Sequence, residues 1–429
     1  MEKIQQENFS TEVIWKDLDN GIKDEYGVIY SIDGKKLLKS TNKDLESYKI
    51  KKDCEIICDG AFKEHSSLKV IEIPNSIIRI GWRAVFFSCT ELISINVDED
   101  NGYYSSIDGV LFDKKQDYLI HYPAGKKDVI YKIPNGVTKI VAYSFMKCTN
   151  LTTIIIPRGV TTIGRGAFMQ CTSLTSITIP NSVSKIYHYV FIGCTSLTSI
   201  NVDEGNKFYS SIDGVLFCNI YKNLNQNELI CYPAGKKDVT YNIPDGVTII
   251  GERAFALNTN LINITIPKSV SNSVTGIGYQ AFRDCTSLTS ITIQEGVKNI
   301  GDGAFWGCTG LTDIVIPNSV TEISIDTFKG CTSLTNITIP TYTTVVDLHG
   351  DRKYLKISDI EDCTGLTNIT IPATTILDLH KGNIKKYSND VLLSNKKDVL
   401  LSNKKQDTID YYFCYLLIIT IYLIFKTCF

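Results

Sequence analysis

Residues 163–180 read IGRGAFMQCTSLTSITIP, and residues 300–317 read IGDGAFWGCTGLTDIVIP, which is the same unit further along the chain. Cys148, Cys171 and Cys194 mark consecutive copies of this unit at intervals of 23 residues. Self-similarity at a short fixed period is typical of solenoids, because one unit cannot bury its apolar edge alone and stacked units share a core. The sequence therefore predicts a long repeat array.

The pattern inside the unit predicts one parallel strand per repeat. In the spacing L-x-x-I-x-I, Leu174, Ile177 and Ile179 suit a strand with one buried face. Proline cannot donate a ladder hydrogen bond, so each strand is expected to end near a proline. These prolines are Pro74, Pro157, Pro180, Pro267, Pro317 and Pro340. The Phe and Cys positions that follow are expected on a short helical or 3₁₀ turn.

The cysteine column is expected inside the solenoid as free thiols. Eight of the 14 cysteines occupy one position of the repeat, three residues after an apolar residue that is usually Phe. Buried cysteine acts as a small apolar residue, and zinc needs clustered ligands rather than stacked ones, so metal binding and disulfides are the weaker alternatives. The predicted core residues are Phe168, Cys171, Cys194, Phe305, Cys308 and Cys331.

The run IGxxAFxxCTSLTSITIP resembles the BspA-like, or Treponema-type, leucine-rich repeat, and the resemblance covers residues 54–372. It implies an α/β fold: a right-handed leucine-rich-repeat solenoid with a concave parallel β-sheet, short helical or 3₁₀ turns and β-hairpin insertions. It also implies surface adhesion and the binding of host or matrix proteins, which are the usual roles of the family.

Two matching insertions interrupt the array, near residues 98–133 and 203–243. In each, two apolar runs flank a polar turn, which predicts a β-hairpin. Residues 1–53 contain a similar hairpin and are expected to cap the first rung, before a solenoid over residues 54–372. A degenerate repeat and linker (residues 373–410) and a hydrophobic tail (residues 411–429) are expected to follow.

The tail leaves three interpretations open. Residues 411–425 read YYFCYLLIITIYLIF without a charge, but this run is shorter than the roughly 20 residues of a full membrane span. It is interpreted as a short membrane anchor with the preceding lysine pairs on the cytoplasmic side, as a cover for the last rung, or as a degenerate terminus. The tandem copies of DVLLSNKK in residues 390–405 point to the last of these, but the membrane anchor is ranked slightly first.

No catalytic, cofactor or metal motif stands out. The chain carries no P-loop, G-x-S-x-G, H-E-x-x-H or C-x-x-C pattern, so we expect a protein that is not an enzyme. The acidic runs at residues 98–101 and 203–206 lack the ligand spacing of a calcium loop, and a solvated turn is the favoured interpretation. Nearly balanced charge, 44 Lys+Arg against 46 Asp+Glu, gives no reason to expect nucleic acid.

Two surfaces are candidates for binding a partner. The outward face of the sheet is small and polar, and the insertions carry the aromatic residues that interfaces favour. On the sheet the candidates are Ser176, Thr178, Thr292 and Thr338. In the insertions they are Tyr103, Tyr104, Tyr118, Tyr122, Phe208, Tyr209, Tyr221 and Tyr232.

The leading hypothesis is a nonenzymatic adhesion module that presents its repeat surface to a host, matrix or partner protein. Residues 1–20 lack the apolar run of a secretory signal, which favours instead an intracellular scaffold tethered to a membrane through residues 411–425. A third hypothesis is that the threonine columns bind an ordered surface such as ice or a glycan crystal. Localisation therefore stays divided between the cell surface, which the resemblance implies, and the cell interior.

Overall fold

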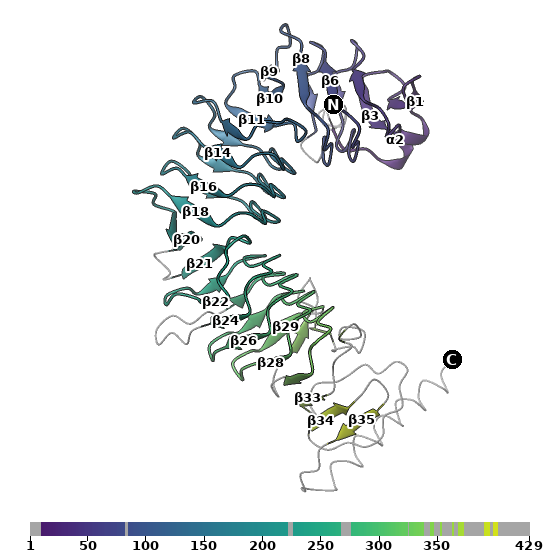
Figure 1. Cartoon of the computed structure of the whole chain (residues 1–429). Helices are drawn as coiled ribbons and strands as arrows, with labels where there is room; N and C mark the ends of the chain where they lie inside the picture. Colours follow the sequence, from purple (N-terminus) through teal and green to yellow (C-terminus); the bar gives the residue numbers. More distant parts are fainter. Residues whose placement is uncertain are drawn as a thin grey trace, which may run out of the picture.

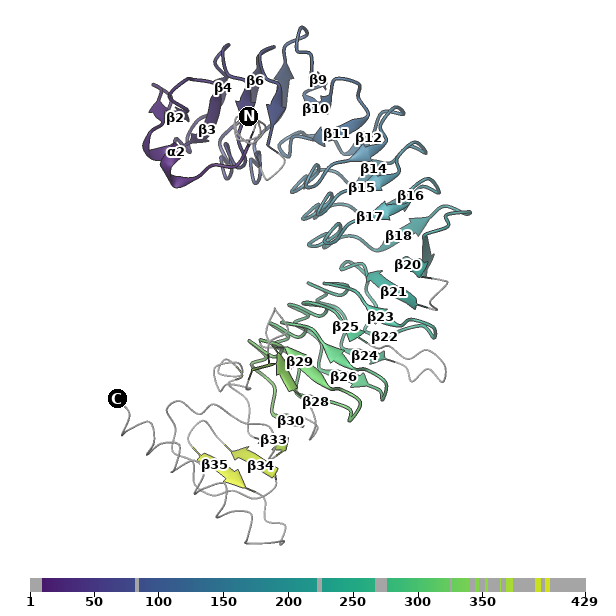
Figure 2. The ribbon, with the colours of Figure 1, turned by 180° about the vertical axis from the view of Figure 1, so that it is seen from behind.

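The rungs of the chain stack along a curved axis and form a crescent (Figures 1 and 2). The computed structural model describes residues 10–81, 85–221, 226–266, 276–324 and 326–338, with short segments between residues 344 and 401. Among these residues one helix occurs, α2 (Trp15–Asp19), at the N-terminal end. The fold is a parallel β-solenoid with almost no helix, in agreement with the repeat pattern.

The L-x-x-I-x-I segments form what we call the long-strand ladder. Its strands pair in parallel and in register, so that Ser176 lies opposite Ser199. The first sheet contains β4 (Ser47–Lys49), β6 (Val70–Ile73) and β8 (Ser94–Val97). The second contains β12 (Ile130–Lys132), β14 (Thr153–Ile155), β16 (Ser176–Ile179) and β18 (Ser199–Val202). The third contains β22 (Thr240–Asn242), β24 (Asn263–Ile266), β26 (Ser290–Ile293), β28 (Asp313–Val315), β30 (Asn336–Thr338) and β33 (Asn368–Pro372).

Six of these strands confirm the predicted role of proline, because β6, β14, β16, β24, β28 and β30 each end one or two residues before their proline. The third sheet then continues in antiparallel fashion through β34 (Asp390–Ser394) and β35 (Asp398–Leu401). These two strands are formed by the tandem copies of DVLLSNKK.

A second set of strands, the short-strand ladder, closes each rung. Its strands also pair in parallel, with Lys139 opposite Thr162 and Thr162 opposite Lys185. They are β5 (Ile56–Ile57), β7 (Arg79–Ile80), β13 (Lys139–Ile140), β15 (Thr162–Ile163), β17 (Lys185–Ile186), β23 (Ile249–Ile250), β25 (Gly276–Ile277), β27 (Asn299–Ile300), β29 (Glu322–Ser324) and β31 (Thr344–Val346). The last of these strands, β31, also pairs antiparallel with β32 (Arg352–Lys353).

Each part of the short-strand ladder begins with a three-stranded antiparallel meander. The first consists of β1 (Ile22–Lys23), β2 (Val28–Tyr30) and β3 (Lys36–Ser40). The second consists of β9 (Tyr104–Ile107), β10 (Val110–Asp113) and β11 (Tyr118–His121), and the third of β19 (Tyr209–Ile212), β20 (Val215–Tyr221) and β21 (Gln226–Cys231). The last strand of each meander pairs in parallel with the ladder that follows. The chain is thus divided into a first array (β1–β8), a second array (β9–β18) and a third array (β19–β35).

The middle strands of the second and third meanders separate the hydrophobic cores. On β10, Leu111 packs into the core of the first array, whereas Val110 and Phe112 pack into the core of the second. On β20, Leu216 packs backward and Val215 packs forward in the same way. Alternate side chains of a strand point to opposite faces, so one strand can serve as the wall between two cores.

The segment between the short-strand ladder and each cysteine is a series of hydrogen-bonded turns where a short helical or 3₁₀ turn was expected. The amide of Ala167 bonds the carbonyl of Gly164, and that of Cys171 bonds the carbonyl of Phe168. Gly166 (φ 58°) and Gln170 (φ 59°) adopt the left-handed conformation inside this segment. A right-handed helix cannot continue through left-handed residues, which explains the difference.

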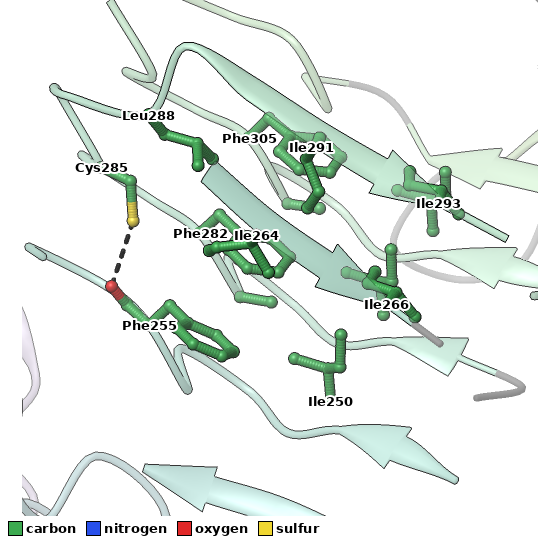
Figure 3. Close-up of a cluster of buried hydrophobic side chains, with 14 of the residues drawn as sticks. Ile250, Phe255, Ile264, Ile266, Phe282, Cys285, Leu288, Ile291, Ile293 and Phe305 are labelled. Carbon is green, nitrogen blue, oxygen red and sulfur yellow. Dashed lines mark hydrogen bonds between the residues drawn. The ribbon is translucent and has the colours of Figure 1, made fainter. Parts of the chain in front are cut away.

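The core of most rungs contains a stacked Phe and a buried Cys, with His65 and Asn258 in place of the Cys in two rungs. Phe255, Phe282, Phe305 and Phe328 follow one another with ring centroids 4.9, 5.2 and 5.7 Å apart. Figure 3 shows the thiol of Cys285 directed at the backbone carbonyl of Phe255, one rung earlier, with an Sγ–O distance of 3.1 Å. A rung that carries the Cys is therefore joined to the rung before it by aromatic contact and by a thiol hydrogen bond.

Two asparagines attach the second and third meanders to the preceding rung. The side-chain amide of Asn101 donates to the carbonyls of Pro74 and Ile77, both at 2.9 Å, and its oxygen accepts the amides of Tyr103 and Tyr104. Asn206 repeats this arrangement at the start of the third array. The runs that were weighed as calcium loops therefore end in an asparagine that holds the backbone.

Candidate binding surfaces

The outward face of the long-strand ladder is polar, as expected, but the two later meanders interrupt it. Ser176, Thr178 and Thr292 are exposed there, whereas the side chain of Thr338 lies outside the described residues. The threonines of the adjoining column bond to the rung before them: the hydroxyl of Thr175 donates to the carbonyl of Thr152 at 3.2 Å. These hydroxyls stabilise the stacking, and the face offers few large side chains to a partner.

The aromatic residues of the meanders divide into surface and core. Tyr103 is 55% exposed and Tyr118 is 45% exposed. Tyr104 is half-buried and accepts the amide of Ile80 at 2.9 Å, and Phe208 packs against the core of the second array. The side chain of Tyr221 lies outside the described residues.

Three other predicted tyrosines are buried and cannot meet a partner. Tyr122 and Tyr232 are 1% and 2% exposed, and their hydroxyls donate to Asp128 and Asp238 at 2.6 and 2.8 Å. Tyr209 is 3% exposed and accepts the amide of Ile186. Tyr122 and Tyr232 are buried because each seals the first rung of its own array, whereas the ring of Tyr209 packs into the core of the second array, which precedes its meander. In all three the hydroxyl stays hydrogen-bonded while the ring is buried.

The structure brings together a set of residues that sequence reasoning missed. They lie on what we call the turn edge, the outer tips of the turns that precede the cysteines. The Tyr189 ring centroid lies 4.6 Å from the guanidinium carbon of Arg165 and 4.6 Å from that of Arg253. Arg253 in turn lies 5.6 Å from the ring of Tyr279. Cation–π contacts thus run from the second array into the third, and we call these four residues the Arg–Tyr stack.

The Arg–Tyr stack is partly buried, and this burial changes the pKa of its central tyrosine. Tyr189, Arg253 and Tyr279 are half-buried and Arg165 is exposed. Burial and the neighbouring Glu252 carboxylate raise the pKa of Tyr189. Glu252 also lies 3.5 Å from the imidazole of His188. Arginine and tyrosine are the residue types that dominate binding energy at protein interfaces, so this is the most interface-like surface on the described part of the chain.

Backbone conformation also distinguishes the turn edge. Most turns contain two left-handed positions. The first is filled by Gly60, Gly166 and Gly303 in some rungs, and by Tyr143 (φ 60°), Tyr189 (φ 67°), Arg253 (φ 54°), Gln280 (φ 51°) and Asp326 (φ 57°) in others. A bulky residue at positive φ costs on the order of 1–3 kcal/mol, and such strain concentrates at functional sites. The signal that could have revealed these residues is a large side chain at a repeat position that elsewhere holds glycine.

A second aromatic–cation group lies further along the turn edge in the third array. The ring of Trp306 lies 4.9 Å from the guanidinium of Arg283 and 4.7 Å from the ammonium of Lys329. Asp284 pairs with Arg283 and Asp326 pairs with Lys329, so these cations are largely neutralised.

The predicted core residues lie in the interior. All six are fully buried, at 0% exposed: Phe168, Cys171, Cys194, Phe305, Cys308 and Cys331. The twelve cysteines of the described segments are free thiols. Burial raises the pKa of Cys171 and Cys194 well above the usual value, which keeps these thiols protonated at neutral pH.

The described residues contain neither a metal-binding cluster nor a membrane-spanning helix. They contain no group of three or more His, Cys, Asp or Glu side chains arranged to hold a metal ion. None of their helices is both long and apolar enough to cross a bilayer. The hydrophobic run of residues 411–425 lies outside the described residues.

The sequence matches the BspA type leucine-rich repeat region over residues 34–117, 129–229 and 235–349. The chain therefore belongs to the BspA-type leucine-rich repeat family. No curated protein matches it significantly.

Three solved structures of bacterial proteins are similar to the chain. A leucine-rich cell surface protein of Faecalibacterium prausnitzii is similar at 25% identity and a TM-score of 0.57, over 82% of this chain and 94% of that one. The pneumococcal vaccine antigen PcpA is similar at 20% identity and a TM-score of 0.47, over 85% of this chain and 82% of that one. A leucine-rich repeat protein of Bacteroides ovatus is 22% identical, with a TM-score of 0.37, over 83% and 96% of the two chains.

Proposed function

We propose that this chain is a nonenzymatic adhesion module that binds a protein on a host, matrix or partner surface. The observation that carries the proposal is the Arg–Tyr stack, in which Tyr189 lies between two guanidinium groups at the junction of the second and third arrays. Its residue types are those of interface hot spots, and two of them, Tyr189 and Arg253, are held in a left-handed backbone conformation at a cost in strain. The cell surface protein that shares this fold is consistent with such a role.

The test is a binding assay with the full chain against immobilised serum and matrix proteins and against cultured-cell surfaces. Binding should disappear when the target surface is first treated with protease. Tyr189→Ala and Arg253→Ala should each weaken binding about tenfold or more, the usual loss at a hot spot. Binding that survives proteolysis of the target would contradict the proposal.

A matched control separates the turn edge from the sheet. Val315 is 68% exposed on the long-strand ladder, far from the stack in sequence and in rung. Val315→Ala should leave binding unchanged, with the melting temperatures of all variants compared to ensure that each is folded. Loss of binding with Val315→Ala but not with Tyr189→Ala would place the site on the sheet.

A further inference from the structure

We infer that the second array carries a docking surface for an acidic segment of a protein partner. The inference rests on the proposed protein-binding function and names the chemistry of the partner. The surface, which we call the basic face, consists of the outward side of the short-strand ladder of the second array and the adjoining part of the turn edge. Its residues are Tyr118, Lys139, Thr162, Arg165, Lys185 and Tyr187.

The charge distribution along the chain singles out this array. Between Asp128 and Asp203 the sequence contains no aspartate or glutamate, although the whole chain carries 46 of them. The same stretch contains the cations Lys132, Lys139, Lys147, Arg158, Arg165 and Lys185. The net charge of −2 for the chain therefore conceals a purely cationic block in the middle of the crescent, where β12–β18 lie (Figure 1).

The ladder register aligns part of this block on one face. Lys139 lies opposite Thr162, and Thr162 lies opposite Lys185, so that all three point outward from consecutive rungs. Strands in a sheet are about 4.8 Å apart, which separates the two lysine Cα atoms by about 10 Å. Tyr118 precedes Lys139 in the same register. The array thus presents a regular row of tyrosine, lysine, threonine and lysine.

These cations have no anionic partner within the described residues. No ion pair forms between a described carboxylate and Lys139, Lys185 or Arg165. Each of these cations contacts an aromatic ring instead. Lys139 lies 5.3 Å from the ring of Tyr118, and Lys185 lies 4.4 Å from the ring of Tyr187. The hydrogen bond from Lys185 lowers the pKa of Tyr187. Cation–π contacts position a lysine without neutralising its charge, so the positive field of the face remains available to a partner.

Carboxylates lie at both ends of the face. At the end next to the third array, Glu252 lies 3.5 Å from the imidazole of His188, which follows Tyr187 in the sequence. At the other end, Asp113 and Asp117 precede β11, and the Asp113 carboxylate accepts the amide of Tyr118 at 2.7 Å. The third array differs, because the rungs equivalent to those of Lys139 and Lys185 hold Ile249 and Asn299 at this position. The basic face is therefore a property of the second array and not of the repeat.

A protein carboxylate fits this face better than phosphate or sulfate. Nucleic acid recognition requires dense cations and stacking platforms, and phosphate selects arginine for its paired donors. Here single lysines are spaced by threonine, and the tyrosine faces are covered by the lysines themselves. An extended peptide with glutamate or aspartate at alternate positions places a carboxylate on one side about every 7 Å, since a strand rises about 3.4 Å per residue. The two lysine Cα atoms are about 10 Å apart, a difference of about 3 Å that flexible lysine and glutamate side chains can span.

The experiment uses the folded full chain and a short fluorescent peptide of alternating glutamate and glycine as the probe. Lys139→Gln/Lys185→Gln is compared with Lys52→Gln/Lys298→Gln, which removes the same charge from exposed positions in the other two arrays. The first variant should bind the probe about five- to tenfold more weakly than wild type, and the control less than about twofold. Gly276→Lys/Glu322→Lys should increase binding, since it places two lysines two rungs apart in the third array, as Lys139 and Lys185 are in the second.

Two results would overturn the inference. One is equal loss of peptide binding in both double variants. The other is tighter binding of a heparin fragment or an oligonucleotide than of the peptide at matched charge and salt, which would assign the face to another polyanion. The binding assay against serum, matrix and cell-surface proteins distinguishes this inference from the proposed function. If Lys139→Gln/Lys185→Gln retains full, protease-sensitive binding, the acidic partner is excluded and adhesion stands; if wild type binds no protein, the proposed function fails first.

Discussion

The thiol of Cys308 donates a hydrogen bond to the backbone carbonyl of Phe282, 26 residues earlier in the chain, at an Sγ–O distance of 3.0 Å. The same bond joins Cys171 to Phe145 and Cys331 to Phe305. This carbonyl also accepts the backbone amide of Cys285 within its own turn, so the thiol adds a second hydrogen bond to it from the next rung. The cysteine column therefore supplies a small apolar group and a donor at once, which explains why the repeat keeps it.

We expect the column thiols to be unreactive in the native protein. Cys171, Cys194, Cys308 and Cys331 are fully buried, and burial raises their pKa values, so the reactive thiolate is absent at neutral pH. Alkylation followed by mass spectrometry should modify these four only after denaturation. Rapid labelling of the native protein, or a mass that indicates disulfides, would contradict this expectation.

Phe305→Ala should destabilise the protein by about 3–5 kcal/mol, because it removes a buried ring that stacks on Phe282 and Phe328. Chemical denaturation of the full chain measures this loss as a lower free energy of unfolding. Val315→Ala truncates a largely exposed side chain and should change stability by less than about 0.5 kcal/mol. Similar denaturation midpoints for the two variants would place the Phe305 ring outside the core.

Asn101→Ala should cost about 2 kcal/mol or more, since it leaves buried backbone groups of the second meander and the preceding rung without hydrogen bonds. We expect hydrogen exchange to accelerate at Tyr103 and Tyr104, whose amides lose their acceptor. Asn181→Ala changes an exposed turn residue and serves as the control. Unchanged exchange at both tyrosines would show that the asparagine does not hold the meander.

Gly303→Ala should destabilise the protein by about 1–2 kcal/mol, because Gly303 has a φ of 58° and a new Cβ would lie 3.2 Å from the Gln280 side chain. Gly102→Ala is the matched control: Gly102 is not left-handed, and a Cβ there meets no atom within 4 Å. Thermal denaturation should separate the two variants. Equal melting temperatures would remove the argument for strain at the turn edge.

The stability of the joint between the first and second arrays should depend on pH through His121. This residue lines a small cavity of about 50 Å³ together with Leu111 and Phe86, and burial lowers its pKa to about 4. In the unfolded chain its pKa is about 6.5, so only the unfolded state takes up a proton as the pH falls from about 6.5 to about 4. Folding stability is therefore complete above this window and declines through it.

A matched variant isolates this effect. Cys231 occupies the corresponding position in the third array, which makes His121→Cys a conservative change. Wild type should lose about 2–3 kcal/mol more than His121→Cys between pH 7 and pH 4.5, as measured by chemical denaturation. His65, whose pKa is also lowered by burial and by Lys43, contributes equally to both proteins. Parallel pH profiles would show that His121 is solvated in the fold.

The sequence alone determined the solenoid, its strands and its interior. A period of 23 residues, the L-x-x-I-x-I spacing and the prolines are local patterns, and each acts within a rung or between neighbouring rungs. Leu174, Phe168 and Cys171 point inward because only that orientation buries their apolar surface in every copy. Such features can be predicted because the same arrangement repeats and a single unit specifies it.

The division into three cores and the composition of the binding surfaces were decided only by the tertiary structure. Leu111 packs backward and Phe112 forward because β10 is inserted between two stacks, which no periodic pattern encodes. Arg165, Tyr189 and Arg253 meet although the third meander, residues 209–231, lies between the last two in the sequence. Tyr122 and Tyr118 belong to one insertion, yet one seals the core and the other faces solvent, because burial depends on which neighbouring rung each ring meets.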